Sequence, residues 1–124
     1  MKKTSLGQNF LIDHNIAQNI VQLAHIQPGE HVVEIGPGKG ILTELLLEQA
    51  DALTAIELDP RLSRDIQNRL GDTPSFKLIE GDAAKFDYGS LGTGIKIVSN
   101  LPYYAATHIM KKLIHFGTHI QSMT

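Results

Sequence analysis

The chain has 124 residues, of which 42% are hydrophobic, so its length and composition predict one folded domain at most. A formal net charge of −2 lacks the basic excess of a domain that binds nucleic acid strongly by itself, and the absence of cysteine excludes disulfide and thiolate chemistry. Apolar runs are only a few residues long, against about 20 for a membrane span, and no signal peptide is recognisable. These features predict a cytoplasmic protein without membrane contact.

The first predicted elements are an extended lead at 8–12 and a helix that Asp13 can cap. The apolar residues of this helix recur at helical spacing before the Pro-Gly break at 28–29, and they are Ile16, Ile20, Leu23 and Ala24. Residues 31–35 are typical of a buried strand, and a glycine loop then opens a second helix. The apolar side of that helix carries Ile41, Leu42, Leu45 and Leu46.

Three further strands are predicted at 52–57, 76–79 and 95–98. Asp59 as the cap and Pro60 at the first helical position mark a third helix after the first of these strands. The buried stripe of that helix is predicted to be Leu62, Ile66 and Leu70. A Gly-rich loop at 89–94 leads into the last of these strands, and a final helix is predicted at 105–116.

The alternation of strands and helices predicts a doubly wound α/β fold in which helices flank a parallel sheet. Such a sheet continues on both sides of its first strand, so a sheet that stops after four strands would leave a buried-type strand as an open edge. Residues 121–124 lie where a fifth strand could begin, so the chain looks cut short. We therefore expect self-association through the exposed sheet edge.

The glycine loop places Gly36, Gly38 and Gly40 at alternate positions after a strand, which allows a sharp turn and a close approach of the backbone to a ligand. Ile41 stands where the dinucleotide pattern requires a third glycine, and the Lys-Ser or Lys-Thr pair of a phosphate-binding loop is absent. Glu34 before the loop favours a cationic ligand. The predicted cofactor is S-adenosylmethionine, which combines a sulfonium, a ribose and an adenine; the alternative is a purely structural turn.

Two acidic residues end the next strands of the predicted sheet. Glu57 can accept hydrogen bonds from ribose hydroxyls, and Asp82, followed by Ala83, can accept one from an adenine amine. Ligands of open α/β sheets bind beyond the carboxyl ends of the strands, so these residues are expected to converge with Gly36 and Asn100. For Asp82 alone, a simple turn residue is the alternative.

The sequence Asn100, Leu101, Pro102 and Tyr103 follows the last predicted strand and suits methylation of an aromatic amine. The nitrogen lone pair is delocalised into the ring, so acceptors such as the Asn100 side chain and a backbone carbonyl must hold the amine hydrogens. Tyr103 can stack on an extruded base, and no titrating base is required. The alternative is a strand-ending turn with a core tyrosine. The histidines at 108, 115 and 119 lack companions for a ligand set, so no metal is predicted.

Five motifs in order, at 8–11, 34–40, 56–59, 81–83 and 100–103, make the chain resemble the ribosomal RNA adenine N6,N6-dimethyltransferases, in particular the bacterial small-subunit group. The resemblance implies a Rossmann-like class I methyltransferase domain, followed in the family by a small helical domain. It also implies dimethylation of two adjacent adenosines near the 3′ end of 16S rRNA during ribosome biogenesis, with the immature 30S subunit as partner.

The resemblance further assigns roles to individual residues. Asn9 and Leu11 would line the methionine side of the donor pocket, with Gly36 passing beneath the donor. Glu57 would hold the ribose, and Asp82 would bind the adenine amine. Asn100 would contact both the donor and the target amine, and Tyr103 would stack on the target base.

Length is the departure from the family, because later strands and the helical domain are missing. Residues 1–124 are therefore expected to form the N-terminal part of the methyltransferase domain, which retains most donor contacts but methylates RNA poorly or not at all. The alternatives are a non-catalytic module that binds S-adenosylmethionine or RNA, and a methyltransferase acting on DNA adenine or a small amine.

Overall fold

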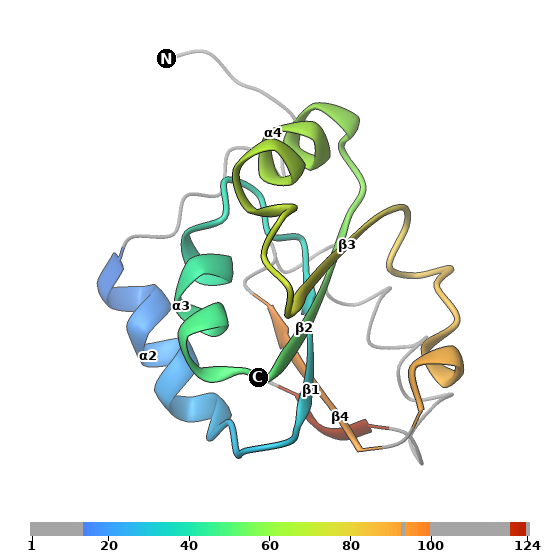
Figure 1. The fold of residues 1–124 in the computed structure, drawn as a ribbon. Coiled ribbons are helices and arrows are strands. Elements are labelled where there is room, and N and C mark those ends of the chain that lie inside the picture. Colours follow the sequence, from blue (N-terminus) through green and yellow to red (C-terminus); the bar gives the residue numbers. More distant parts are fainter. Residues whose placement is uncertain (1–13, 93, 100–119, 124) are drawn as a thin grey trace.

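A computed structural model describes residues 14–92, 94–99 and 120–123 as a parallel sheet covered by helices (Figure 1). The helices are α2 (His14–Ala24), α3 (Ile41–Gln49) and α4 (Pro60–Leu70), with a short 3-10 helix, η1 (Tyr88–Leu91). The strands are β1 (His31–Ile35), β2 (Ala52–Glu57), β3 (Phe76–Glu80), β4 (Ile95–Ser99) and β5 (Ile120–Met123). None of the helices that the structure describes has the length and apolar character needed to cross a bilayer.

The sheet has the order β3-β2-β1-β4-β5, and all of its pairings are parallel. The chain therefore builds outward from β1 to β3 and then crosses to the other side of β1 to make β4. Ile35 pairs with both Ile56 and Ser99, so the three central strands end almost level. The loops that follow them emerge at one edge of the sheet, at the point where the strand order reverses.

The four predicted strands are confirmed, and β3 and β4 each extend one residue further than predicted. β5 is an additional short strand, at the place where a fifth strand was expected to be able to begin. It pairs with the outer side of β4, so the expectation that the fourth strand is an open edge is wrong for β4. The predicted helix at 105–116 lies outside the described residues.

The core has two parts, one on each face of the sheet. The three helices cover one face, where Val32, Leu46, Leu53 and Ile66 are among the buried residues. The segment that contains η1 covers the other face, and Tyr88 is its largest buried side chain. Strand residues alternate between these two layers, which is why β1 and β2 are apolar along most of their length.

The buried side of α2 agrees with the prediction in part: Ala24 is buried and Ile20 packs against the core, as predicted. Ile16 and Leu23 are 45% and 68% exposed, and the residues that face the core are Ala17, Val21 and Ala24. Two alanines in the buried row allow the helix to lie close to the sheet, which a row of larger side chains would prevent. The predicted stripe of α3 is confirmed, and in α4 Ile66 and Leu70 belong to the core as predicted. Polar Thr43 and Ser63 are buried on these helices as well.

A buried charged cluster joins the chain before β1 to the amino end of β4. Lys96 is 4% exposed, and its Nζ donates to the His25 carbonyl oxygen at 2.8 Å and pairs with Glu30 Oε1 at 3.0 Å. The same carboxylate oxygen accepts the Gln27 backbone N–H at 2.6 Å. This cluster lies at the end of the sheet opposite to the glycine loop.

Candidate functional site

The loop between β1 and α3 has the conformation that its glycines predict. Gly36, Gly38 and Gly40 have φ values of 70°, 59° and 90°, in the left-handed region that residues with a side chain rarely adopt. The Gly36 N–H donates to the Ile56 carbonyl oxygen at 2.9 Å, which joins the start of the loop to β2. The Gly40 N–H donates to the Pro37 carbonyl oxygen at 2.9 Å and closes the turn into α3.

Glu57 connects the glycine loop to the end of β2. Its Oε1 accepts the Gly38 N–H at 3.0 Å, its Oε2 accepts the Asp59 N–H at 2.9 Å, and the residue is 6% exposed. A carboxylate oxygen has two lone pairs, so each oxygen retains capacity for one more donor. The side chain predicted to receive ribose hydroxyls is thus also the side chain that fixes the loop.

Asp82 lies in a turn directly after β3. Its Oδ1 accepts the Ala84 N–H at 2.9 Å, and its backbone carbonyl accepts the Lys85 N–H at 2.9 Å. The turn is connected to β2 because the Gly81 N–H donates to the Glu57 carbonyl oxygen at 2.8 Å. Asp82 therefore lies at the same edge of the sheet as Glu57.

Tyr88 fixes the segment that follows Asp82. Its hydroxyl donates to the Ala83 carbonyl oxygen at 2.7 Å in the buried layer under the sheet, and its ring meets Phe86 edge to face at 5.1 Å. Burial, together with the nearby Asp82 charge, raises the pKa of the Tyr88 phenol. The phenol consequently remains a hydrogen-bond donor, and this bond keeps Ala83 in place.

The expectation that Glu34 offers a negative charge to a cationic ligand is wrong, because this side chain is buried. It is 1% exposed, and its Oε1 accepts the Thr43 hydroxyl at 2.6 Å beneath α3. Burial raises the pKa of Glu34 to about 8, the Thr43 hydrogen bond opposes this shift, and the Glu57 charge adds to it. Strand alternation explains the error, because residue 34 shares the helix-covered side of β1 with Val32.

The structure thus brings Gly36, Gly38, Glu57 and the turn at 82–83 to one edge of the sheet. The remaining predicted site residues lie outside the described residues, and their roles stay predictions: Asn9, Leu11, Asn100, Leu101, Pro102 and Tyr103. Within the described part of the chain, no group of three or more His, Asp or Glu side chains comes together as a metal site would require.

The sequence analysis missed two residues beside the glycine loop. Leu58 directly follows Glu57 and is 65% exposed, although it follows a buried strand. Arg69, at the end of α4, donates from Nη2 to the Lys39 carbonyl oxygen inside the loop. An apolar residue between Glu57 and the Asp59 cap was a visible signal for Leu58. No local pattern indicates a contact between residues 39 and 69.

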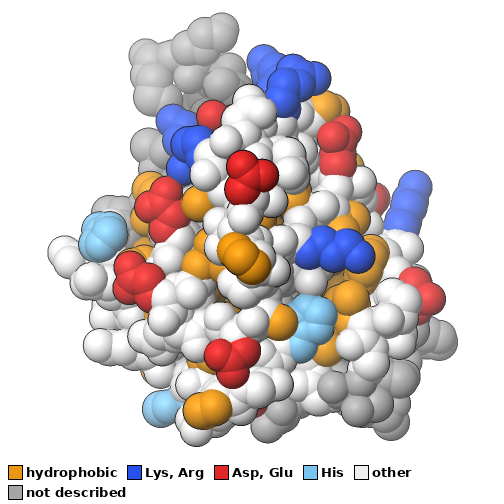
Figure 2. Space-filling model, in the orientation of Figure 1, with side chains coloured by type: hydrophobic (Ala, Val, Ile, Leu, Met, Phe, Trp, Pro, Cys, Tyr) orange, Lys and Arg blue, Asp and Glu red, His pale blue; other side chains and the backbone are white. Residues whose placement is uncertain are grey.

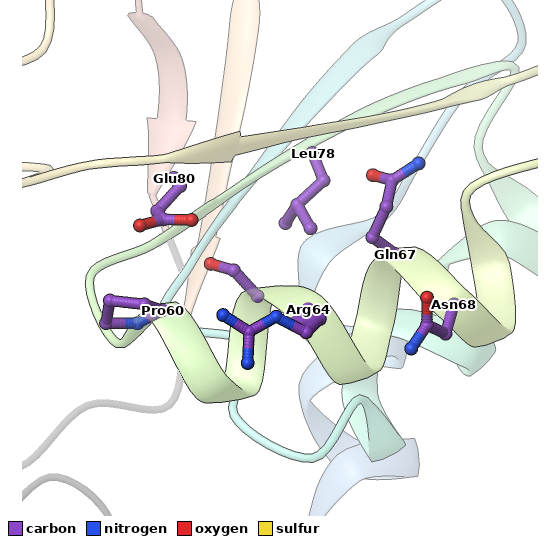
Figure 3. A pocket seen from close by; sticks show the side chains of 7 residues that line it. Pro60, Arg64, Gln67, Asn68, Leu78 and Glu80 are labelled. Carbon is purple, nitrogen blue, oxygen red and sulfur yellow. The ribbon is translucent and has the colours of Figure 1, made fainter.

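A groove of about 280 Å³ lies between α4 and β3, next to the end of β2 (Figure 3). Two of its lining residues contact Glu57: the Ser63 hydroxyl donates to the Glu57 carbonyl oxygen, and Glu80 pairs with Glu57 in the sheet. Arg64, Gln67 and Asn68 of α4 line one wall, with Leu78 and Glu80 of β3 opposite. None of the predicted site residues lines it. On the face of the molecule in Figure 2, acidic and basic side chains are interspersed, in keeping with the net charge of −2.

The strand order, the glycine loop after β1 and the acidic end of β2 define a Rossmann-like class I methyltransferase fold. The family model of the ribosomal RNA adenine dimethylases matches residues 1–124, and the chain belongs to this family. The resemblance predicted from the five motifs is therefore confirmed.

Two curated relatives are named ribosomal RNA small subunit methyltransferase A. The Thiobacillus denitrificans protein is 49% identical over 120 residues, which cover 94% of this chain and 46% of the relative. The Clostridium acetobutylicum protein is 43% identical over 122 residues, which cover 96% of this chain and 44% of the relative. The chain spans less than half the length of these relatives.

Solved structures show the same arrangement. The 23S rRNA methyltransferase ErmE superimposes with a TM-score of 0.81 at 28% identity, over 93% of this chain and 47% of that chain. A dimethyladenosine transferase from Plasmodium falciparum superimposes with a TM-score of 0.73 at 29% identity, over 86% of this chain and 38% of that chain.

Proposed function

We propose that residues 1–124 are the donor-binding part of an S-adenosylmethionine-dependent enzyme that dimethylates the N6 amines of two adjacent adenosines near the 3′ end of 16S rRNA. Membership of the ribosomal RNA adenine dimethylase family supports this proposal, as do the names of the relatives. The substrate is then the immature 30S subunit in the bacterial cytoplasm, where methylation belongs to ribosome biogenesis.

The observation that carries the proposal is the contact between Glu57 and the Gly38 amide at 3.0 Å. It places a carboxylate acceptor against the backbone of the glycine loop. Among the described residues, a Cβ built at Gly38 would have only the Gly36 carbonyl oxygen nearby, at 3.9 Å, which leaves space beside it for a ligand. The described residues therefore fit the nucleoside end of S-adenosylmethionine.

In the proposed site, each strand end binds a different part of the donor. Glu57 accepts hydrogen bonds from the ribose hydroxyls, and Asp82 accepts one from the adenine amine. The exposed Leu58 provides an apolar surface for the flat adenine ring. Gly36 and Gly38 let the donor lie close to the backbone, with Asn9 and Leu11 on its methionine side.

The target adenine is proposed to meet the residues that follow β4. Bound S-adenosylmethionine supplies an electrophilic methyl group on its sulfonium. The Asn100 side-chain oxygen and the carbonyl of Leu101 or Pro102 hold the hydrogens of the target amine and aim its nitrogen, while Tyr103 stacks on the base. Hydrogen-bond acceptors alone suffice for this positioning, so no residue needs to titrate near neutral pH.

Calorimetric titration of S-adenosylmethionine into the chain tests donor binding. We expect saturable binding that weakens about tenfold or more in Glu57→Gln, since hydrogen bonds to charged groups contribute about 1.5–3 kcal/mol. Glu48→Gln is the matched control, because Glu48 is an exposed carboxylate on α3 away from the loop. Equal binding by both variants would contradict the assignment of Glu57.

Transfer of labelled methyl groups to immature 30S subunits tests the second half of the proposal. We expect little or no transfer by residues 1–124, because they span less than half of the relatives. In a relative of full length, alanine at the position equivalent to Asn100 should abolish methylation and leave RNA binding nearly unchanged. Methylation that survives this substitution would favour the alternative of a non-catalytic binding module.

A further inference from the structure

We propose that Arg69 is a positioning residue that presets the glycine loop for the nucleoside end of the donor. This inference deepens the proposed function and rests on it for the identity of the ligand. Arg69 lies in the last turn of α4, far along the chain from the loop, and no motif in the sequence includes it.

The three nitrogens of the Arg69 guanidinium each have a different partner. Nη2 donates to the Lys39 carbonyl oxygen, Nη1 lies 3.0 Å from Glu44 Oε2 of α3, and Nε lies 3.3 Å from Asp65 Oδ2 of α4. One planar group therefore joins the loop, the helix that follows the loop, and α4.

Gly40 shows how closely the guanidinium lies against the loop. A Cβ built at this position would be 2.9 Å from Arg69 Nη2, closer than real Cβ contacts, and the residue also has a φ of 90°. Glycine at position 40 thus meets two requirements at once. It supplies a left-handed turn, and it lets the guanidinium reach the Lys39 carbonyl.

Glu57 and Arg69 hold the glycine loop through different backbone groups, Glu57 through an N–H and Arg69 through a C=O. Glu57 accepts the Gly38 N–H and Arg69 donates to the Lys39 C=O, so the two peptide units on either side of the segment 38–39 are both held by side chains. Three glycines with positive φ would otherwise give this segment wide conformational freedom. Fixing the loop before the donor arrives removes the entropy cost of ordering it from the binding step.

Lysine at position 69 cannot make the same three contacts, because a single ammonium group cannot reach three partners that match the planar guanidinium. The Arg69 side chain is also 38% exposed, so its ion pairs with Glu44 and Asp65 contribute little to global stability. The main consequence of losing Arg69 should therefore be local, in the conformation of the loop.

The test compares Arg69→Met and Arg69→Lys with Arg64→Met, a charge-matched control on the same helix whose side chain lines the groove between α4 and β3. Calorimetry with S-adenosylmethionine should show binding about tenfold weaker in Arg69→Met, as for loss of one charge-assisted hydrogen bond. Arg69→Lys should recover only part of the affinity. Arg64→Met should bind within about twofold of the unmodified chain.

Hydrogen exchange in the absence of donor gives a second readout. The Gly40 amide, bonded to the Pro37 carbonyl, should exchange faster in Arg69→Met, while amides of β1 and β2 keep their protection. Unchanged loop exchange, or an equal loss of affinity in Arg64→Met, would overturn the inference. So would faster exchange throughout the sheet, because Arg69 would then have a general structural role.

These measurements distinguish failure of the proposed donor binding from failure of the role proposed for Arg69. A chain that gives no heat with S-adenosylmethionine contradicts donor binding by residues 1–124, yet the exchange of the Gly40 amide still decides whether Arg69 presets the loop. A chain that binds donor equally well with and without Arg69 contradicts only the present inference.

Discussion

Arg69 and Lys96 are two cations that bind a backbone carbonyl and carboxylates at opposite ends of the sheet. Arg69 holds the glycine loop at the carboxyl end and its side chain is 38% exposed. Lys96 holds the segment before β1 at the amino end and its side chain is 6% exposed. The contacts are alike but the environments differ: the Lys96 contacts are almost fully buried, whereas the Arg69 contacts are partly exposed to solvent.

The burial of each ion pair determines how much stability is lost when its cation is removed. Breaking a buried ion pair leaves an uncompensated charge away from water and costs about 3–5 kcal/mol, whereas exposed pairs contribute about 0–1 kcal/mol. Lys96 lies on a central strand beneath the helices, where water cannot replace Glu30 as its partner. Arg69 lies at the surface, where water can solvate Glu44 and Asp65 if the guanidinium is removed.

The largest effect is expected from Lys96→Met, which removes the buried ammonium that pairs with the Glu30 carboxylate. Urea denaturation should show a loss of about 3 kcal/mol in the free energy of unfolding. Lys77→Met, on the exposed side of β3, is the control and should change it by less than about 0.5 kcal/mol. A loss below about 1 kcal/mol at Lys96 would remove the contrast between the two cations.

Gly40→Ala should have the next largest effect. An alanine at a φ of 90° costs about 1–3 kcal/mol, and here its Cβ would also displace the Arg69 guanidinium. Gly29→Ala is a matched control, because Gly29 has a φ of 83° and no atom within 4 Å of the added Cβ. Thermal unfolding should show both losses. Only Gly40→Ala should also weaken donor binding, and equal binding by both variants would argue against the contact with Arg69.

The contacts of Glu30 with Lys96 and Gln27 should also make the free energy of unfolding depend on pH in the acidic range. The Gln27 backbone N–H, and then Lys96, hold the pKa of Glu30 below its usual 4.5. The stabilisation is therefore complete above the unfolded-state pKa and is lost as the pH falls through the lower folded-state pKa. Unfolding free energies measured from about pH 6 to about pH 3 should fall more steeply in the unmodified chain than in Glu30→Gln. Parallel curves would exclude Glu30 as the source.

Arg69→Met should have the smallest effect on stability, a loss below about 1 kcal/mol in the free energy of unfolding. This prediction sharpens the comparison, because the same variant should change the donor affinity and the loop exchange. A loss as large as that of Lys96→Met would show that Arg69 stabilises the fold as a whole.

Local patterns predicted most of the fold, because strand and helix periodicity depends on neighbouring residues. The bounds of β1 and β2, the cap at Asp59 and the glycine turn all follow from such patterns. Features that depend on distant contacts were harder to predict. The buried side of α2 is set by its packing on the core, and the pKa of Glu34 is raised because this carboxyl is buried beneath α3.

The residues of the candidate site also differ in whether local sequence patterns or distant contacts determine their positions. Gly36, Glu57 and Asp82 could be predicted because ligands bind where parallel strands end, a rule that needs only the order of elements. Arg69 could not, since its contact with Lys39 arises only when α4 packs beside the loop. Leu58 was visible in the sequence, but its exposure is a property of the folded chain.

For redesign of the proposed site toward a donor with a modified nucleoside, Glu57 is not an independent position. Its carboxylate is already an acceptor for the Gly38 and Asp59 amides, so any replacement changes the scaffold together with the selectivity. Leu58, which is 65% exposed, is the adjacent position that can be varied without loosening the loop. Library diversity is therefore better placed at residue 58, with Glu57 held constant.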